Sequence, residues 1–247
     1  MAEVGTRMYL GNHLVGTYVD GVEVFTNTFE YEEPPGSYVT DGLILAWDIG
    51  NPSSYPGTGT TIYDLSGNDY SGSLIGGVTY SSDYGGVLEF DGTGVVRTAT
   101  SLTPDLRYVS HSVMGASRYN GATRGRMINA YDDNWLMGNW SNSTENYYAE
   151  GWVTSVGNGA NDTNWRIYAA LGDRPNDQWS LYVNDVLEAS SAGGAFGPAG
   201  FSVGAAQGNA ASEPSTGQFS FLLVYDRTLT TDEMTQNYDY FKARFGL

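Results

Sequence analysis

The chain contains no cysteine, and this absence removes several kinds of chemistry at once. Without thiols there can be no disulfide framework, no zinc–thiolate centre and no cysteine nucleophile. No apolar run approaches the roughly 18 residues that a membrane-spanning helix needs. The segment from Met1 to Leu10 lacks a basic stretch followed by an apolar one, so no signal peptide is expected.

Positive charge is scarce as well. The 247 residues include 11 Lys and Arg against 28 Asp and Glu, and Lys242 is the only lysine, so the formal net charge is −17. Nucleic acids and anionic membranes are bound by clustered basic residues, whereas the arginines here are spread from Arg7 to Arg244. We therefore expect no nucleic-acid partner and no membrane partner, and we interpret the negative charge as a contribution to solubility.

Glycine and aromatic residues are abundant instead. The chain has 33 Gly, 19 Tyr and 6 Trp beside only 16% charged residues, and glycine in an average protein is about 7%. From Asp41 onward, apolar alternation recurs between Gly- and Asn-rich turns, and no helical segment recurs between the strands. The sequence therefore predicts an all-β sandwich, or jelly roll. The expected strands are 43–48, 87–90, 126–129, 135–137, 147–153, 165–169, 179–184, 201–204 and 219–225.

One helix is expected, near the C-terminus. Thr230 and Glu233 have the spacing of a capping box, in which each side chain bonds the other residue's backbone N–H. Met234, Tyr238 and Phe241 follow at the spacing of one helical face. We expect a short helix that packs on the sandwich and carries no chemistry.

The N-terminal residues form a separate region. Residues 8–16 align with residues 17–25 as a short repeat, and each copy has the pattern strand, turn, strand. We predict a β-hairpin region over 1–30 that anchors or oligomerises the protein, because two such hairpins are too small to be stable alone. The acidic, proline-containing stretch 31–40 is predicted to be a linker, and 41–247 the sandwich.

Four motifs resemble a known kind of domain. They are 43–48 (LILAWD), 63–68 (YDLSGN), 88–92 (LEFDG) and 221–229 (FLLVYDRTL). In this order they are similar to the opening and closing strands of laminin-G-like (LamG), concanavalin A-like domains, over about 41–247. The N-terminal repeat is similar to short β-repeats of tailed-phage virion proteins. The resemblance implies a concanavalin A-like sandwich that binds glycans or surfaces, in some members with calcium.

A cluster of aromatic residues is the best candidate for ligand binding. The rings alternate with amide and carboxylate side chains, and sugars present both apolar CH faces and hydroxyls to such a surface. Part of the cluster must lie in the core, because large aromatic residues dominate sandwich interiors. Alternation places Trp135 and Trp140 on opposite faces, so at most one of them should be exposed. The predicted ligand-binding residues are Trp135, Trp140, Tyr147, Tyr148, Glu150 and Trp152.

A calcium site is one of two interpretations of the stretch that begins at Asp64. Asp64 and Asn68 occupy the first and fifth positions of an EF-hand loop, but Asp69 stands where that loop needs glycine. A different calcium site could use oxygen ligands from Asp64, Asn68, Asp69 and Asp91. The favoured alternative is an Asx turn, in which Asp64 and Asn68 bond their own backbone.

Enzymatic interpretations have little support. Residues 200–204 match the pattern G-x-S-x-G around Ser202, but that chemistry needs a histidine after the serine, and both His13 and His111 precede it. We expect both histidines to be surface or turn residues. Glycoside hydrolysis needs two facing carboxylates. No Glu-x-Asp-x-Glu alternation occurs, which leaves a pair assembled from separate strands, for example Glu145 with Glu150.

Three hypotheses for the function follow. The first is a non-enzymatic surface protein of a tailed-phage virion, a decoration protein, fibre or adhesin. Residues 1–30 would contact other virion proteins or copies of the same chain, and the lectin-like domain would bind a glycan or a host surface. The second is a soluble carbohydrate-binding module of a bacterial surface protein, and the third is a glycoside hydrolase.

Overall fold

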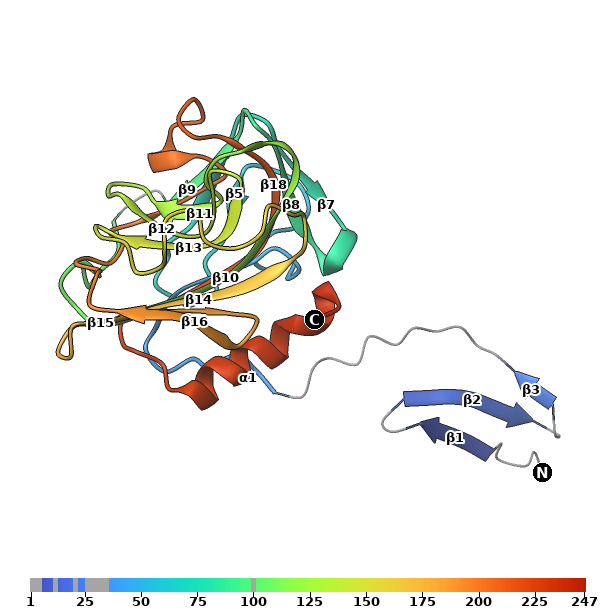
Figure 1. Ribbon diagram of the computed structural model, residues 1–247. Coiled ribbons are helices and arrows are strands. Elements are labelled where there is room, and N and C mark those ends of the chain that lie inside the picture. Colours follow the sequence, from blue (N-terminus) through green and yellow to red (C-terminus); the bar gives the residue numbers. More distant parts are fainter. Residues whose placement is uncertain (1–5, 11–12, 20–21, 25–35, 99–100) are drawn as a thin grey trace. The chain divides into compact units, whose positions relative to one another are not determined.

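The computed structural model describes residues 6–10, 13–19, 22–24, 36–98 and 101–247, and it divides the chain into two units, Met1–Glu33 and Pro34–Leu247 (Figure 1). In the first unit, β1 (Thr6–Leu10), β2 (His13–Val19) and β3 (Val22–Val24) form an antiparallel sheet in the order β1-β2-β3. The second half of the first repeat and the first half of the second are thus one continuous strand, β2. The two expected hairpins share this strand.

The second unit is a sandwich of two antiparallel sheets. The larger sheet has the order β16-β15-β14-β10-β18-β8-β7, and β4 also pairs with β18. Its strands are β4 (Leu43–Asp48), β7 (Val78–Ser81), β8 (Val87–Asp91), β10 (His111–Arg124), β14 (Arg166–Asp173), β15 (Gln178–Val183), β16 (Val186–Ser191) and β18 (Ser215–Tyr225).

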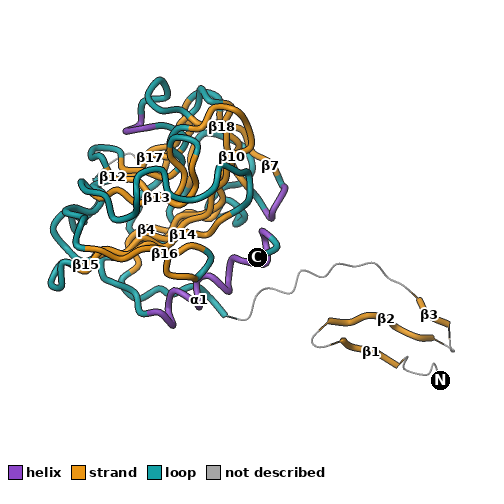
Figure 2. The backbone as a smooth tube through the Cα atoms, in the orientation of Figure 1, coloured by secondary structure: helices purple, strands orange, loops and turns teal. Residues whose placement is uncertain are grey.

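The smaller sheet has the order β13-β12-β11-β17-β9-β6-β5. It contains β5 (Thr61–Ile62), β6 (Gly72–Ile75), β9 (Val95–Thr98), β11 (Ile128–Ala130), β12 (Trp135–Trp140), β13 (Ser143–Ala149) and β17 (Phe201–Val203). Short 3-10 helices cover Asp83–Gly85, Ala206–Gly208 and Ala243–Phe245. Figure 2 shows the two layers of strands, and the predicted all-β sandwich is confirmed.

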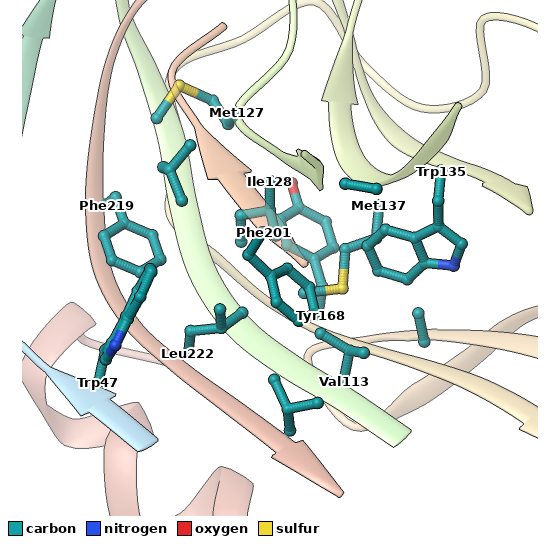
Figure 3. Close-up of a cluster of buried hydrophobic side chains, with 14 of the residues drawn as sticks. Trp47, Val113, Met127, Ile128, Trp135, Met137, Tyr168, Phe201, Phe219 and Leu222 are labelled. Atoms are coloured by element: carbon teal, nitrogen blue, oxygen red, sulfur yellow. The ribbon is translucent and has the colours of Figure 1, made fainter. Parts of the chain in front are cut away.

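The main core fills the space between the sheets. Trp47, Trp135, Phe201, Phe219 and Leu222 meet there and have almost no exposed surface (Figure 3). Because the core takes large side chains from both inner faces, each strand contributes every second residue to it. In β15, for example, Trp179 and Leu181 are buried in this core, as the alternation predicts.

A second apolar cluster covers the outer face of the larger sheet, where the helix α1 (Thr231–Lys242) lies (Figure 1). Phe221 and Phe241 stack with their ring centroids 3.6 Å apart, and Met234 is buried beside them. The capping box forms as predicted: the Thr230 hydroxyl accepts from the Glu233 backbone N–H, and the Glu233 carboxylate accepts from the Thr230 N–H.

Strand β10 was not predicted, although it lies in the middle of the larger sheet. Its first seven residues are all buried because the core covers one face and the helix-side cluster the other. A strand buried on both faces has no polar alternation for a sequence pattern to reveal. Small residues such as Gly115 also belong to this packing, since a Cβ there would lie 2.9 Å from the Phe221 carbonyl oxygen.

Two sequence predictions need correction. The linker predicted over 31–40 extends too far, because Val39 is buried and its backbone N–H donates to the Asn237 side chain at 2.8 Å. Residues 37–40 are therefore part of the sandwich. His111 was expected at the surface or in a turn but is fully buried, with Nδ1 3.2 Å from the Val109 carbonyl oxygen. The side chain of His13 lies outside the described residues.

Candidate functional site

The structure divides the predicted aromatic cluster between the interior and the surface. Trp135 and Tyr147 are fully buried, with their ring centroids 5.7 Å apart in an edge-to-face contact. They sit on the inner faces of neighbouring strands β12 and β13, so their prediction as ligand-binding residues is wrong. Trp140 lies on the other side of β12 and is partly exposed, which confirms that Trp135 and Trp140 lie on opposite faces.

Three rings remain at the surface and contact one another. The Trp152 ring centroid is 5.1 Å from that of Trp140 and 5.1 Å from that of Tyr148, and the second contact is edge-to-face. All three side chains are partly exposed. We call Trp140, Tyr148 and Trp152 the aromatic triad. Its contacts hold the rings in fixed relative orientations, with part of each ring open to solvent.

The β12–β13 hairpin positions two of these rings. Ser141 and Asn142 form the two-residue turn and both have positive φ, 48° and 71°, as the tight hairpin turn requires. The register shifts between Gly138 and Trp140. Gly138 has φ +82°, and a Cβ at this position would lie 2.6 Å from the Tyr168 ring. Only glycine therefore fits this irregular position, which precedes Trp140 by two residues.

Trp152 is held against the outer edge of the same hairpin. β13 is the edge strand of the smaller sheet, and beyond it Trp152 bridges to Tyr148. The Val153 N–H donates to the Tyr147 carbonyl at 3.0 Å, and the Thr154 hydroxyl accepts from the Tyr147 N–H at 3.0 Å. These bonds hold the segment after β13 along the outer edge of that strand, which places the indole beside Tyr148.

One carboxylate, Glu213, contacts the triad, and a second, Glu150, lies between Tyr148 and Trp152 in the chain. The indole Nε1–H of Trp140 donates to Glu213 Oε1 at 2.8 Å, while Glu213 Oε2 lies 2.6 Å from Arg126 Nε. Glu150 accepts from the backbone N–H of Asn134 at 2.8 Å. Both glutamates are exposed, so each keeps oxygen lone pairs that can accept from a ligand hydroxyl.

The triad with these carboxylates offers apolar ring faces beside fixed hydrogen-bond acceptors. This combination suits an uncharged, hydroxyl-rich ligand such as a sugar. Sequence reasoning found Trp140, Tyr148, Glu150 and Trp152 but missed Glu213, which comes from a loop far along the chain. No local pattern connects Glu213 to Trp140, because only the fold brings them together.

The stretch proposed for calcium forms a turn. Asp64 Oδ1 accepts from the backbone N–H groups of residues 46 and 66, at 2.8 and 2.9 Å. Its Oδ2 accepts from the Ser66 hydroxyl at 2.7 Å and from the N–H of residue 70 at 3.0 Å. Asn68 Nδ2 donates to the Ile44 carbonyl oxygen at 3.1 Å. Both oxygens of Asp64 thus bond the chain itself, as the Asx-turn interpretation predicts.

Asp69 and Asp91 do not join Asp64 in a metal site. Asp69 Oδ1 accepts from the Ser71 hydroxyl, and Asp91 Oδ1 accepts from the Thr93 N–H and hydroxyl at 2.8 and 2.7 Å, bonds that lower the Asp91 pKa. Among the described residues, no three acidic or histidine side chains form a group that could hold a metal ion. Calcium binding by the four predicted ligands therefore gains no support from their arrangement.

The residues considered for catalysis are occupied in other ways. Glu145 bonds Arg166 at 2.9 Å, while Glu150 lies beyond the other end of β13, roughly 16 Å away for an extended chain of five residues. A retaining glycosidase needs its carboxylates about 5–5.5 Å apart and an inverting one about 6.5–9.5 Å. Ser202 is fully buried and donates to the Ala205 carbonyl at 2.8 Å, so it is not an exposed nucleophile.

No family model matches the chain, and no curated protein matches it. Solved structures do resemble it. Domain 4 of AbnA, a GH43 extracellular arabinanase from Geobacillus stearothermophilus, in complex with arabinotriose, has a TM-score of 0.57 and 17% identity, over 81% of this chain and 98% of that one. These likenesses establish the fold.

Two of the similar structures come from toxins. The binding domain of Paraclostridial Mosquitocidal Protein 1 has a TM-score of 0.58 at 12% identity, and the binding domain of Botulinum Neurotoxin DC, in complex with SialylT, has 0.55 at 13%. Each match covers 81% of this chain and 52% of the toxin domain. The protein thus shares its sandwich with about half the length of each toxin binding domain.

No helix in the described part of the chain is long and apolar enough to cross a membrane.

Proposed function

We propose that the protein is a non-enzymatic glycan-binding protein whose aromatic triad contacts the sugar. One observation carries the proposal: Trp140, Tyr148 and Trp152 are partly exposed yet locked together at 5.1 Å ring separations. A preorganised apolar platform loses little entropy on binding. The ligands in two similar structures, arabinotriose and SialylT, support a glycan as the ligand class.

The test uses a glycan array followed by calorimetric titration of the best ligand, with arabinotriose as the first single probe. Trp152→Ala removes the central ring of the triad and should weaken binding at least tenfold. Tyr63→Ala is the matched control, because Tyr63 is 52% exposed and lies outside the triad. An array without any hit, or equal losses from both variants, would refute the proposal.

The setting that we propose for this binding is the surface of a tailed-phage virion, with residues 1–30 as the assembly element. The three-stranded sheet supports this: within the described residues, β1 and β3 each pair only with β2. The outer edges of both strands therefore carry unpaired backbone groups that another strand can extend. A second copy of the chain, or another virion protein, would supply that strand.

Light scattering on the full chain and on a shortened chain beginning at Gly36 tests the assembly role. An oligomeric full chain with a monomeric shortened chain is the expected result. If both are monomers, self-assembly through residues 1–30 is refuted. The alternative function, a soluble carbohydrate-binding module, then becomes the better one, and the match to nearly the whole of the arabinanase domain favours it.

The non-enzymatic part of the proposal rests on the separation of Glu145 and Glu150 and on their other bonds. Incubation with each glycan that binds should release no reducing ends. Release that disappears in Glu145→Gln or Glu150→Gln would instead support the glycoside hydrolase hypothesis.

A further inference from the structure

A groove of about 600 Å³ opens at the end of the sandwich where β14 begins and β15 ends. Arg118 of β10, Trp165 and Arg166 line it, together with Tyr84 and the C-terminal residues 245–247. Its volume lies within the usual range for small-molecule sites, about 300–1,000 Å³. The aromatic triad does not line this groove.

Two aromatic rings contact the guanidinium of Arg118 within the groove. Its guanidinium carbon lies 4.8 Å from the Tyr84 ring centroid and 5.4 Å from that of Trp165. Its Nε–H donates to Gln218 Oε1 at 2.7 Å, and Nη1 reaches the Thr163 carbonyl at 3.4 Å. The ring contacts and the Nε bond together restrain the guanidinium before any ligand arrives.

The charge of Arg118 has no carboxylate partner among the described residues, and its Nη2 has no hydrogen-bond acceptor there. Its neighbour Arg166 differs, because Glu145 lies at 2.9 Å and Asp162 at 2.8 Å. The bonds from Arg166 lower the pKa of Asp162 to about 2, so Asp162 stays ionised and compensates Arg166. Arg118 is therefore a cation without a direct carboxylate contact among the described residues, in a groove that Tyr84 and Phe245 also line.

We propose that this groove is a second ligand site and that it binds a sugar unit carrying a carboxylate. A planar guanidinium matches a carboxylate through two parallel N–H bonds, which is its strongest kind of hydrogen-bonded pair. The partly exposed rings of Tyr84 and Phe245 beside it suit the apolar face of the sugar that carries the carboxylate. The Arg166–Glu145 pair and the Asn184 side chain add polar groups to the lining.

The test compares two trisaccharides that differ mainly in charge, α-1,4-linked trigalacturonate and neutral α-1,4-galactotriose, by calorimetric titration of the full chain at low salt. The wild-type protein should bind trigalacturonate at least tenfold more tightly. Arg118→Gln should abolish that preference. Arg97→Gln is the control, because Arg97 also stacks on a tyrosine, Tyr131 at 5.3 Å, without a carboxylate partner among the described residues, and it does not line the groove. It should leave the preference intact.

One further sugar and two further variants distinguish the possible results of this titration. Methyl α-N-acetylneuraminide, a second carboxylate-bearing sugar, tells a sialic acid site from a uronic acid site; if it binds only when Arg118 is present, the proposal holds. Arg118→Lys keeps the charge but loses the planar fork, so it should reduce the preference and serves if Arg118→Gln fails to fold. Binding of neither acidic sugar, equal binding of the neutral one, or equal losses from Arg97→Gln would overturn the proposal. Trp152→Ala should leave this site unaffected, so its outcome is independent of the aromatic triad.

Discussion

His111 should make the sandwich less stable as the pH falls from about 6.5 towards 4. The imidazole is fully buried against Trp179, with ring centroids 5.6 Å apart, and Nε2 has no hydrogen-bond partner among the described residues. Burial, assisted by the charge of Arg174 and opposed by the bond to Val109, lowers the pKa of His111 to about 4. The folded protein therefore holds this ring neutral.

The sign and size of the effect follow from proton linkage. Below a pH of about 6.5 the unfolded chain protonates His111 while the folded chain does not, so the free energy of unfolding falls as the pH falls. Between the unfolded pKa near 6.5 and the folded pKa of about 4, the full loss is about 3 kcal/mol. About 2 kcal/mol of it should already be lost on going from pH 7.5 to pH 5.

Urea unfolding monitored by near-ultraviolet circular dichroism at a series of pH values measures this loss. His111→Asn is the comparison, because its amide can replace the Nδ1–H donor to Val109 but does not titrate. The variant should be less stable at every pH, yet its free energy of unfolding should fall by about 2 kcal/mol less than that of the wild type between pH 7.5 and 5. Parallel pH profiles for the two proteins would refute the assignment of a buried, neutral His111. His13 and the carboxylates are present in both proteins, so their contributions to the free energy of unfolding cancel when one pH profile is subtracted from the other.

Three further predictions concern stability and use the same unfolding assay. Gly138→Ala should cost about 2–4 kcal/mol, because φ is +82° and the added Cβ would lie 2.6 Å from the Tyr168 ring; a loss below 1 kcal/mol would contradict it. Arg244→Met should cost about 3–5 kcal/mol, since it strands Asp48, which is 2% exposed and bonded to Arg244 at 2.6 Å. Wild-type stability in this variant would show that the buried Asp48 does not depend on Arg244. Thr230→Ala should cost about 1 kcal/mol through loss of the capping box, and Thr230→Ser should restore most of it.

The sequence contained enough to predict most strands and the helix. Alternating residues such as Trp179 and Leu181 are buried as expected, because a strand between a core and an outer face must alternate. The Thr230–Glu233 capping box fixed the start of α1, because its bonds connect residues three apart in the chain. These features are local, and local chemistry alone decides them.

The candidate site could be predicted only in part, because the exposure of each ring depends on what covers the face of the sheet that carries it. Trp135 and Trp140 belong to the same strand and carry the same side chain, yet one is fully buried and the other is partly exposed. Alternation shows that they face apart, but only the packing of Phe201 against Trp135 decides which one is inside. The sequence narrowed the candidate ligand-binding surface to a group of aromatic rings, and the packing of the sheets decided which of these rings are exposed.

Contacts between segments far apart in the sequence could not be predicted, because only the tertiary structure brings these segments together. Glu213 reaches Trp140 from another loop, and Arg118 meets Trp165 and Tyr84 only because three separate segments come together at one end of the sandwich. The sequence by itself determined an acidic, cysteine-free chain of short strands with one capped helix. The fold decided which aromatic rings reach solvent and which arginines of the described residues lack a carboxylate partner, because burial and ion pairing are properties of neighbours in space and not of neighbours in the chain.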